Sequence, residues 1–209
     1  MVYDAVIFDL GGVVVGSPLH AIARFEREHG IAQGFVNRVV VATGAAGAWS
    51  RLERGEIGLE EFYLSFEREC VEAGHALSAR VLLDRVAEAT VPRPAMMEAI
   101  RRIRAAGLRT AALTNNWISE DSGSGALRPF FDVFVESSVV GLRKPDPRIY
   151  RLACDRLGIE PARAVFLDDI GTNLKTARAL GMATIKVADP ESALAELETL
   201  LEIPLRPPA

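Results

Sequence analysis

Polar side chains that could do chemistry stand at the ends of apolar runs, or just before helical patterns, at several points in this sequence. They include carboxylates, a hydroxyl, an amide and an amine: Asp9, Thr114, Asn115, Lys144, Asp168 and Asp169. Taken singly, each has an ordinary structural explanation, because strand-end aspartates often form turns and lysines are often solvated. Together they suggest a charged centre. Carboxylates buried side by side need a counter-charge, which a hard divalent cation and one lysine supply.

Five short runs rich in β-branched and aromatic residues predict the strands that would carry these side chains. The first is "AVIFDL", and the others lie at 109–114, 132–137, 163–168 and 183–187. Helical patterns separate the runs; Met96, Ile100 and Ile103 share one helical face, which stops at Gly107. Apolar strands alternating with helices are typical of a parallel sheet covered on both faces. We therefore predict an α/β fold with a Rossmann-like parallel sheet, whose carboxyl edge gathers the six residues.

Proline and glycine mark the ends of the later helices. Asp146-Pro147 predicts the start of a helix that ends at Gly158, and Asp189-Pro190 predicts the start of the last helix. The final stretch, "PLRPPA", is too rich in proline for regular structure. We expect it to be a loose end.

The alternation of strands and helices breaks between about Ser17 and Thr90. This stretch shows helical periodicity and no convincing strand, and one of its apolar faces is formed by Leu59, Phe62, Tyr63 and Phe66. We predict a Rossmann-like core made of residues 1–16 and 91–209. Residues 17–90 are predicted to be a helical insert after the first strand.

The composition is that of a soluble globular protein, with 49% hydrophobic and 25% charged residues in a chain of 209. A net charge of −4 attracts neither nucleic acid nor an anionic membrane. No apolar run approaches the ~18 residues that a membrane-spanning helix needs. Cys70 and Cys154 lack metal-ligand spacing and are expected to be buried hydrophobes. We expect a cytoplasmic protein that contacts neither nucleic acid nor membrane.

Four stretches, taken in order, resemble the haloacid dehalogenase-like (HAD) hydrolase superfamily across essentially the whole chain. They are "FDLGGV", "LTN", "KPDPRIY" and "FLDDIGTNLKTARALGM". The stretches "LTNNW" and "VFLDDIGTNLKTARALGM" are most similar to the phosphatase domains fused to soluble epoxide hydrolase and to acyl-CoA dehydrogenase-like proteins. The epoxide-opening activity is not carried over. The resemblance implies a magnesium-dependent phosphatase of a small phosphorylated metabolite, with residues 17–90 as a cap over the site.

The resemblance also implies a role for each matching residue in the first and last of these stretches. Asp9 would be the nucleophile, attacking phosphorus to form an aspartyl-phosphate that water then hydrolyses. Mg²⁺ would be held by Asp9, by the main-chain carbonyl of Gly11 and by Asp169. These parts position the reacting groups and neutralise charge, as phosphoryl transfer requires.

The remaining matches would bind the phosphoryl group and support the metal site. Thr114 and Asn115 would hydrogen-bond the phosphoryl oxygens, and Lys144 would neutralise the nucleophile and the phosphoryl group. Asp168 would anchor Lys144 through a salt bridge, and Asn173 would orient a metal-bound water.

Gly11 stands where the family pattern has a second aspartate, which serves as general acid and then general base. A glycine keeps the carbonyl that binds the metal and loses the proton transfer, which is typically worth ~10²–10⁴ in rate. Residues that could replace it are His20, Glu53, Glu56 and Asp168. His20 stands just inside a helix start, and Glu53 and Glu56 resemble exposed helix-end charges. Water is the simpler substitute.

Other functions remain open at this stage. Dehalogenases of the family also lack the second aspartate. By the resemblance, however, they need no metal and do not carry a pair like Asp168-Asp169, so this pair argues against a dehalogenase. A carbon–phosphorus hydrolase would need an amine in the cap, and residues 17–90 contain no lysine. A non-catalytic domain that binds phosphate and metal is the alternative from another class, although a binder has no need of a nucleophile at position 9. Possible anion contacts in the cap are Arg24, Arg27, Arg38, Arg51 and Arg54.

Overall fold

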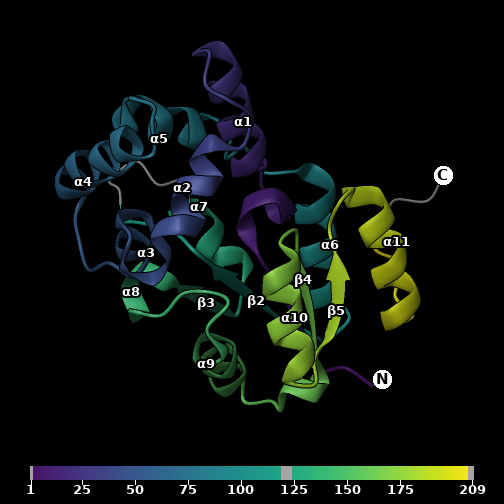
Figure 1. Cartoon of the computed structure of the whole chain (residues 1–209). Helices are drawn as coiled ribbons and strands as arrows, with labels where there is room; N and C mark the ends of the chain where they lie inside the picture. Colours follow the sequence, from purple (N-terminus) through teal and green to yellow (C-terminus); the bar gives the residue numbers. More distant parts are fainter. Residues whose placement is uncertain (1, 119–123, 207–209) are drawn as a thin grey trace.

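Five parallel strands form one sheet, as the sequence predicts (Figure 1). The computed structural model describes residues 2–118 and 124–206. Within them the strands are β1 (Ala5–Phe8), β2 (Arg109–Thr114), β3 (Val133–Glu136), β4 (Ala164–Asp168) and β5 (Ala183–Lys186). Each strand lies inside one of the five predicted runs. The predicted α/β fold with a parallel sheet is therefore confirmed.

Helices cover both faces of the sheet. They are α6 (Pro94–Ala105) and α11 (Pro190–Leu201) on one face, and α9 (Pro147–Leu157) and α10 (Gly171–Ala179) on the other. Val6 of β1 joins the apolar cluster on the first face, and its neighbour Ile7 joins the cluster on the second. Successive side chains of a strand point to opposite faces, so a strand that is apolar at every position needs this double cover.

The order of strands in the sheet is β3-β2-β1-β4-β5, which places a switch in direction between β1 and β4. After β1 the chain moves outward through β2 to β3, and it then returns to lay β4 against the other side of β1. Such a switch leaves a crevice outside the carboxyl ends of the two strands, where proteins of this class bind ligands. Asp9 directly follows β1, and Asp169 directly follows β4.

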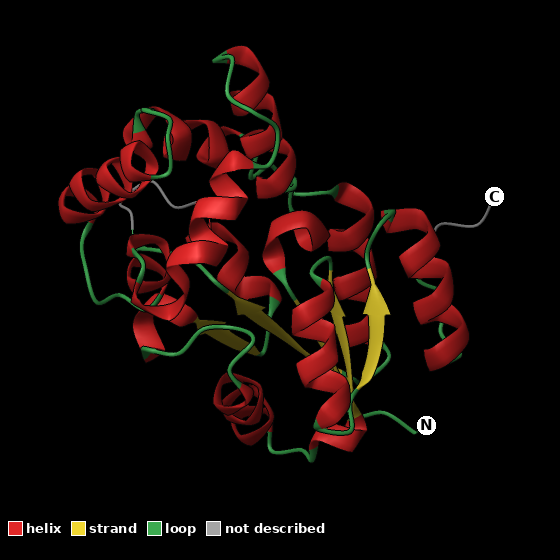
Figure 2. Ribbon diagram, in the orientation of Figure 1, coloured by secondary structure: helices red, strands yellow, loops and turns green. Residues whose placement is uncertain are grey.

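A helical segment, residues 17–90, follows β1 and has an apolar cluster of its own. Its helices are α1 (Pro18–Glu28), α2 (Phe35–Thr43), α3 (Ala48–Glu53), α4 (Leu59–Glu72) and α5 (Ala79–Glu88). Phe62 and Phe66, both fully buried, stack at 5.2 Å in the middle of this cluster. Figure 2 shows the helical segment beyond the arrowheads of the strands, which mark the carboxyl edge of the sheet.

The chain leaves the sheet for the helical segment and returns from it at adjacent points. Val15 and Pro92 form an antiparallel bridge. On either side of it, Arg93 N donates to Val14 O at 2.9 Å and Gly16 N donates to Val91 O at 3.1 Å. The two crossings therefore run side by side, next to the predicted boundaries after residue 16 and after residue 90.

The helix ends agree with the predictions from proline and glycine, but the C-terminal tail does not. Asp146 caps α9, whose C-cap is Gly158, and Asp189 caps α11. The expectation of a loose end from residue 204 onward is wrong for residues 204–206. Leu205 is fully buried, and Glu198 of α11 accepts hydrogen bonds from the main-chain N–H groups of Leu205 and Arg206, each at 2.8 Å. Residues 207–209 lie outside the described part of the chain.

The remaining α-helices of the described residues are short: α7 (Ser124–Leu127), between β2 and β3, and α8 (Ser137–Val140), directly after β3. Cys70 and Cys154 are free and buried, as expected, and burial raises the pKa of Cys70 to about 12. In residues 2–118 and 124–206, no helix has the length and apolar character needed to cross a membrane.

Candidate active site

Asp9 is held at the end of β1 by a tight turn. Its main-chain N–H continues the sheet by donating to Leu167 O of β4 at 2.9 Å. The chain then turns through Gly11 (φ −62°, ψ 125°) and Gly12 (φ 78°, ψ −14°), which are the angles of a type II turn. A Cβ atom at Gly12 would lie 2.6 Å from Cγ of Asp169 and closer still to its Oδ2. Glycine at position 12 therefore allows both the turn and the close approach of Asp169.

Lys144 is the counter-charge at the centre of the site. Its side chain is only 1% exposed, and Nζ lies 2.8 Å from Asp9 Oδ1 and 2.8 Å from Asp168 Oδ2. Asp9 Oδ1 also accepts from the main-chain N–H of Leu10 at 2.7 Å. Both contacts fall on the same oxygen of Asp9. Oδ2 is left without a hydrogen bond to any described residue, so it is available to a ligand.

Both carboxylate oxygens of Asp168 are occupied by contacts with neighbouring residues. Besides Lys144 on Oδ2, it accepts from Ile170 N on Oδ1 at 2.7 Å, and from Nδ2 of Asn173 on both oxygens at 3.0 and 3.1 Å. Asn173 is fixed in turn through its main-chain oxygen, which accepts from the buried hydroxyl of Tyr150 at 3.1 Å. The structure thus pairs Asp168 with Lys144, as predicted, and aims the amide N–H₂ of Asn173 at Asp168.

Negative charge exceeds positive charge among these groups. Carboxylate oxygens of Asp9, Asp168 and Asp169 lie within 4.8 Å of one another, with Lys144 as the cation that contacts two of them. Burial raises the pKa of Asp9 to about 7, with Lys144 acting against it and Asp168 adding to it. Burial and the charge of Asp168 also raise the pKa of Asp169. A second cation would relieve this accumulation of charge.

The pKa of Lys144 shows how tightly it is bound to its carboxylates. Burial on its own would lower this pKa, because it disfavours the charged ammonium group. The charges and hydrogen bonds of Asp9 and Asp168 outweigh the burial and hold the pKa above its usual value. Lys144 therefore stays protonated.

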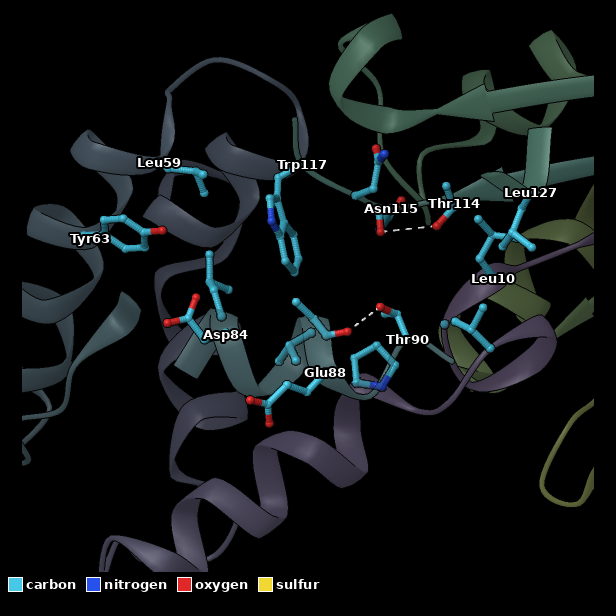
Figure 3. Close-up of a pocket in the computed structure, with 17 residues that line it drawn as sticks. Leu10, Leu59, Tyr63, Asp84, Glu88, Thr90, Thr114, Asn115, Trp117 and Leu127 are labelled. Carbon is cyan, nitrogen blue, oxygen red and sulfur yellow. Dashed lines mark hydrogen bonds between the residues drawn. The ribbon is translucent and has the colours of Figure 1, made fainter. Parts of the chain in front are cut away.

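Thr114 and Asn115, at the end of β2, occupy the neighbouring strand end. Thr114 is buried with its hydroxyl facing a cavity. The side chain of Asn115 is already used: Oδ1 accepts from Lys144 N at 2.8 Å, and Nδ2 donates to Lys144 O at 3.0 Å. Of the two groups that the resemblance assigned to phosphate, the threonine hydroxyl makes one long hydrogen bond, donating to Asn115 O at 3.4 Å (Figure 3), whereas the asparagine side chain holds the loop that carries Lys144. The main-chain N–H of Asn115 remains as the group of this residue that could bind a phosphoryl oxygen.

Two cavities open between the sheet edge and the helical segment, and they share Gly11, Pro18 and Asn115 in their walls. One, of about 360 Å³, is lined mainly by apolar side chains of the helical segment together with Trp117 and Thr114 (Figure 3). The other, of about 670 Å³, is lined by residues of α1, α2 and α3 together with Asp9, Lys144 and Asp169. A ligand at the shared wall would reach the charged centre from one side and an apolar space from the other.

Comparisons with known proteins place this arrangement in a family. A model of haloacid dehalogenase-like hydrolases matches residues 3–181. The chain belongs to this family of hydrolases. Acyl-CoA dehydrogenase family member 10 of Mus musculus is 44% identical over 97% of the chain, and bifunctional epoxide hydrolase 2 of Sus scrofa is 36% identical over all of it. The chain spans only 20% and 41%, respectively, of the lengths of these two relatives.

Solved structures show the same fold. A predicted HAD-like family hydrolase from Porphyromonas gingivalis superposes with a TM-score of 0.73 at 22% identity, covering 96% of this chain and 98% of that one. The resemblance found in the sequence is therefore confirmed at the level of family and fold.

The residues that could replace the family's second aspartate fall in different places. His20 is exposed on α1 and lines a separate hollow, and Glu56 is exposed and paired with Arg54. The expectation that Glu53 is an exposed helix-end charge is wrong. Glu53 is 8% exposed, and its Oε2 lies 2.6 Å from Arg143 Nε. Nothing in the local sequence of α3 reveals this burial, because the partner is distant in sequence.

The five arginines considered as anion contacts do not line either of the two cavities. Arg24, Arg51 and Arg54 instead form ion pairs within the helical segment. The basic side chains in the described walls come from the core, namely Arg143 and Lys144, both lining the larger cavity. Arg143 was missed by the sequence analysis, although it directly precedes the lysine.

Gly11 itself could not simply regain a side chain. Its φ of −62° suits any residue, so the backbone angle does not require glycine. A Cβ atom there would, however, lie 2.9 Å from Cγ and 3.0 Å from Cδ of Pro18, the first residue of α1. Placing an aspartate at position 11 therefore requires α1 to move or Pro18 to be replaced as well.

Proposed function

We propose that this HAD-family hydrolase is a magnesium-dependent phosphatase that acts on a small phosphorylated metabolite through an aspartyl-phosphate. The observation that supports it most is the state of Asp9. One of its oxygens is fixed by Lys144 and by Leu10 N–H, and the other has no described partner and lies at the wall of a cavity. A carboxylate that is oriented in this way is prepared to act as a nucleophile.

The donor set fits a magnesium ion. Asp9 and Asp169 supply carboxylate oxygens, and the carbonyl of Gly11 belongs to the turn that follows Asp9. Hard oxygen ligands are those that Mg²⁺ prefers, and the excess of carboxylates over lysine calls for a cation. Asp168 is left out of this set because its oxygens are taken by Lys144, Ile170 N–H and Asn173. Mg²⁺ bound there would neutralise phosphoryl charge and hold the phosphoryl group in place.

The chain's own residues would carry out the transfer. Asp9 Oδ2 attacks phosphorus, the bond to the leaving oxygen breaks, and water later hydrolyses the aspartyl-phosphate. Lys144 neutralises Oδ1 of the nucleophile and the nearest phosphoryl oxygen. The Thr114 hydroxyl and the main-chain N–H of Asn115 donate to the other phosphoryl oxygens. Asp168, held by Asn173, keeps the lysine amine in position.

The helical segment would serve as a cap on a core formed by residues 1–16 and 91–209. Its separate apolar cluster and the paired crossings at Val15 and Pro92 support a body that is joined to the core at one place. Both cavities lie between this segment and the sheet edge, so a closed cap would exclude water from the phosphoryl group.

The absence of an aspartate side chain at position 11 bears on the substrate. Without a positioned acid, the leaving oxygen must take its proton from water or depart with its charge. Leaving groups that carry charge well, such as aryl, acyl or anomeric oxygens, are therefore favoured over simple alkyl alcohols. The apolar cavity beside Thr114 offers room for such a group.

The proposal is tested by assaying Asp9→Asn beside the natural protein, on an aryl and an alkyl phosphate, with Mg²⁺ titrated from zero. We expect activity only with Mg²⁺, a higher kcat/KM for the aryl phosphate, and no measurable turnover in Asp9→Asn, since an amide oxygen cannot form the aspartyl-phosphate. Circular dichroism and Tm confirm that the variant is folded. Turnover in Asp9→Asn within a few-fold of the natural protein would exclude Asp9 as the nucleophile.

Gly11 also agrees with a dehalogenase, and the same assay separates the two reactions. A short 2-chloro acid, incubated with chelator in place of Mg²⁺, should release no chloride if the proposal holds. Chloride release without metal would favour the dehalogenase. A natural protein that binds inorganic phosphate and Mg²⁺ but turns over neither substrate would favour the non-catalytic alternative.

A further inference from the structure

An ion pair joins helix α3 of the helical segment to the loop that carries Lys144. Arg143 Nε lies 2.6 Å from Glu53 Oε2, and Arg143 Nη1 donates to Ser50 Oγ at 2.9 Å. Glu53 and Arg143 stand 90 residues apart in sequence, and their side chains are only 10% and 26% exposed. A pair so shielded from water and salt interacts more strongly than an exposed one.

Glu53 Oε2 is also linked to Lys144 through the side chain of Asn115. Asn115 Nδ2 lies 3.4 Å from Glu53 Oε2 and also donates to Lys144 O at 3.0 Å, while Asn115 Oδ1 accepts from Lys144 N. The two residues that contact Glu53 Oε2 are thus the neighbour of Lys144 in the chain and the side chain that holds its main-chain groups. Through Arg143 and through Asn115, Glu53 is thus connected to the backbone of Lys144, which determines where the lysine amine lies.

The other oxygen of Glu53 faces the interior of the helical segment. Glu53 Oε1 accepts from Trp49 Nε1 at 3.0 Å, and the Trp49 ring packs edge-on against Trp117 at 6.2 Å. Trp117 follows β2 and extends into the apolar cavity (Figure 3). Glu53 therefore has partners on both sides of the junction, and moving the segment away would break its ion pair with Arg143.

We propose that Glu53 is a positioning residue for Lys144, and that the helical segment, through Glu53, sets the place of the lysine amine beside Asp9. The inference rests on the proposed phosphatase function. It predicts that Lys144 is correctly placed only while the helical segment lies on the core. Substrate enclosure and completion of the charged centre are then a single event.

A pair that only fastened the segment to the core would behave differently. Its loss would lower stability, or would raise KM by weakening enclosure of the substrate, without changing kcat. A positioning residue affects kcat, because a misplaced lysine stabilises the phosphoryl group less in the transition state than it should. The mobility of the Lys144 backbone distinguishes the two roles independently of activity.

The test compares Glu53→Gln with Glu56→Gln. Glutamine at position 53 keeps the size of the side chain and an acceptor for Trp49, and removes the charge that binds Arg143. Glu56, three residues further on, is exposed and paired with Arg54 inside the helical segment, which makes it a matched control. We measure kcat and KM separately, Tm, and amide hydrogen exchange of the peptide containing Lys144, with and without inorganic phosphate.

We expect Glu53→Gln to lower kcat about 10- to 100-fold with little change in KM, and to speed exchange at Lys144. Glu56→Gln should match the natural protein in all four measurements. In Glu53→Gln/Arg143→Gln the losses should not add, because the two residues act as a unit. An unchanged kcat with unchanged exchange at Lys144 overturns the inference, as does a rise in KM alone. If the natural protein hydrolyses no phosphate ester, the proposed function fails, and the exchange data still decide whether Glu53 positions Lys144.

Discussion

At the scale of single residues, Gly12 controls how closely the loop after Asp9 approaches Asp169, which we propose as a ligand of Mg²⁺. Its φ of 78° suits glycine, and a Cβ atom there would overlap the carboxylate of Asp169. In Gly12→Ala we expect Asp169 to be pushed away, so that the Mg²⁺ concentration giving half-maximal activity rises about 10- to 100-fold, as for other changes around metal ligands. A magnesium titration of activity measures this shift, and calorimetric titration of Mg²⁺ measures it without substrate.

Gly30→Ala is a control that introduces backbone strain without a clash. Gly30 has a similar φ of 66°, and a Cβ atom there would meet nothing within 4 Å. Gly30→Ala should lose roughly 1 kcal/mol of stability, because alanine disfavours the left-handed conformation, and Gly12→Ala should lose more because of the added clash with Asp169. Only Gly12→Ala should change the magnesium requirement. Equal magnesium curves for the two variants would show that Asp169 is not a ligand.

The residue types and their order were enough to predict which side chains meet, but not how each is used. Apolar runs with polar ends predicted that Asp9, Lys144 and Asp168 converge, since parallel strands share one carboxyl edge. The use of Asn115 depends on the path of the Lys144 loop, which no local pattern encodes. The burial of Glu53 depends likewise on a partner 90 residues away.

At the scale of elements, Glu198 of α11 fastens the chain beyond the helix. It accepts from two main-chain N–H groups and from the guanidinium of Arg206, and Arg206 is the first cause of a pKa lowered to about 2. A carboxyl whose folded pKa lies below its unfolded value stabilises the fold above the unfolded pKa. That contribution is lost as the pH falls from about 4.5 through about 2.

Glu198→Gln therefore has a pH-dependent effect. At pH 7 the variant should melt below the natural protein, and the gap in Tm should shrink toward pH 2, where the natural residue is itself protonated. Thermal melts of both proteins across this range test the expectation. A gap in Tm that does not depend on pH would mean that Glu198 acts through packing rather than charge.

The elements themselves were largely predictable, and the exception has a physical reason. Strands and helices carry their periodicity and their end residues locally, so β1 to β5 and the caps Asp146 and Asp189 could be located from sequence. The stretch after α11 has no periodicity. Its order comes from Leu205 entering the apolar cluster beside α6 and from Glu198, which are contacts of tertiary structure.

At the scale of the whole molecule, the described chain contains separate apolar clusters in the helical segment and on each face of the sheet. Phe62 lies in the first of these clusters and Ile103 in one beside the sheet, and both are fully buried. Truncating either to alanine should cost about 2–5 kcal/mol. The region that is destabilised should differ between the two variants, because regions with separate apolar cores can unfold separately.

Phe62→Ala should therefore loosen the helical segment while the sheet stays closed. In amide hydrogen exchange we expect peptides from α1 to α5 to exchange faster than in the natural protein, with peptides from β1, β2 and β4 unchanged. Ile103→Ala, the matched control, should speed exchange in the strands. Because a loosened segment no longer holds Glu53 against Arg143, the Lys144 peptide should also exchange faster in Phe62→Ala, although Phe62 belongs to α4 and Glu53 to α3. Equal acceleration of strands and helices in Phe62→Ala would show that core and segment unfold as one cooperative unit.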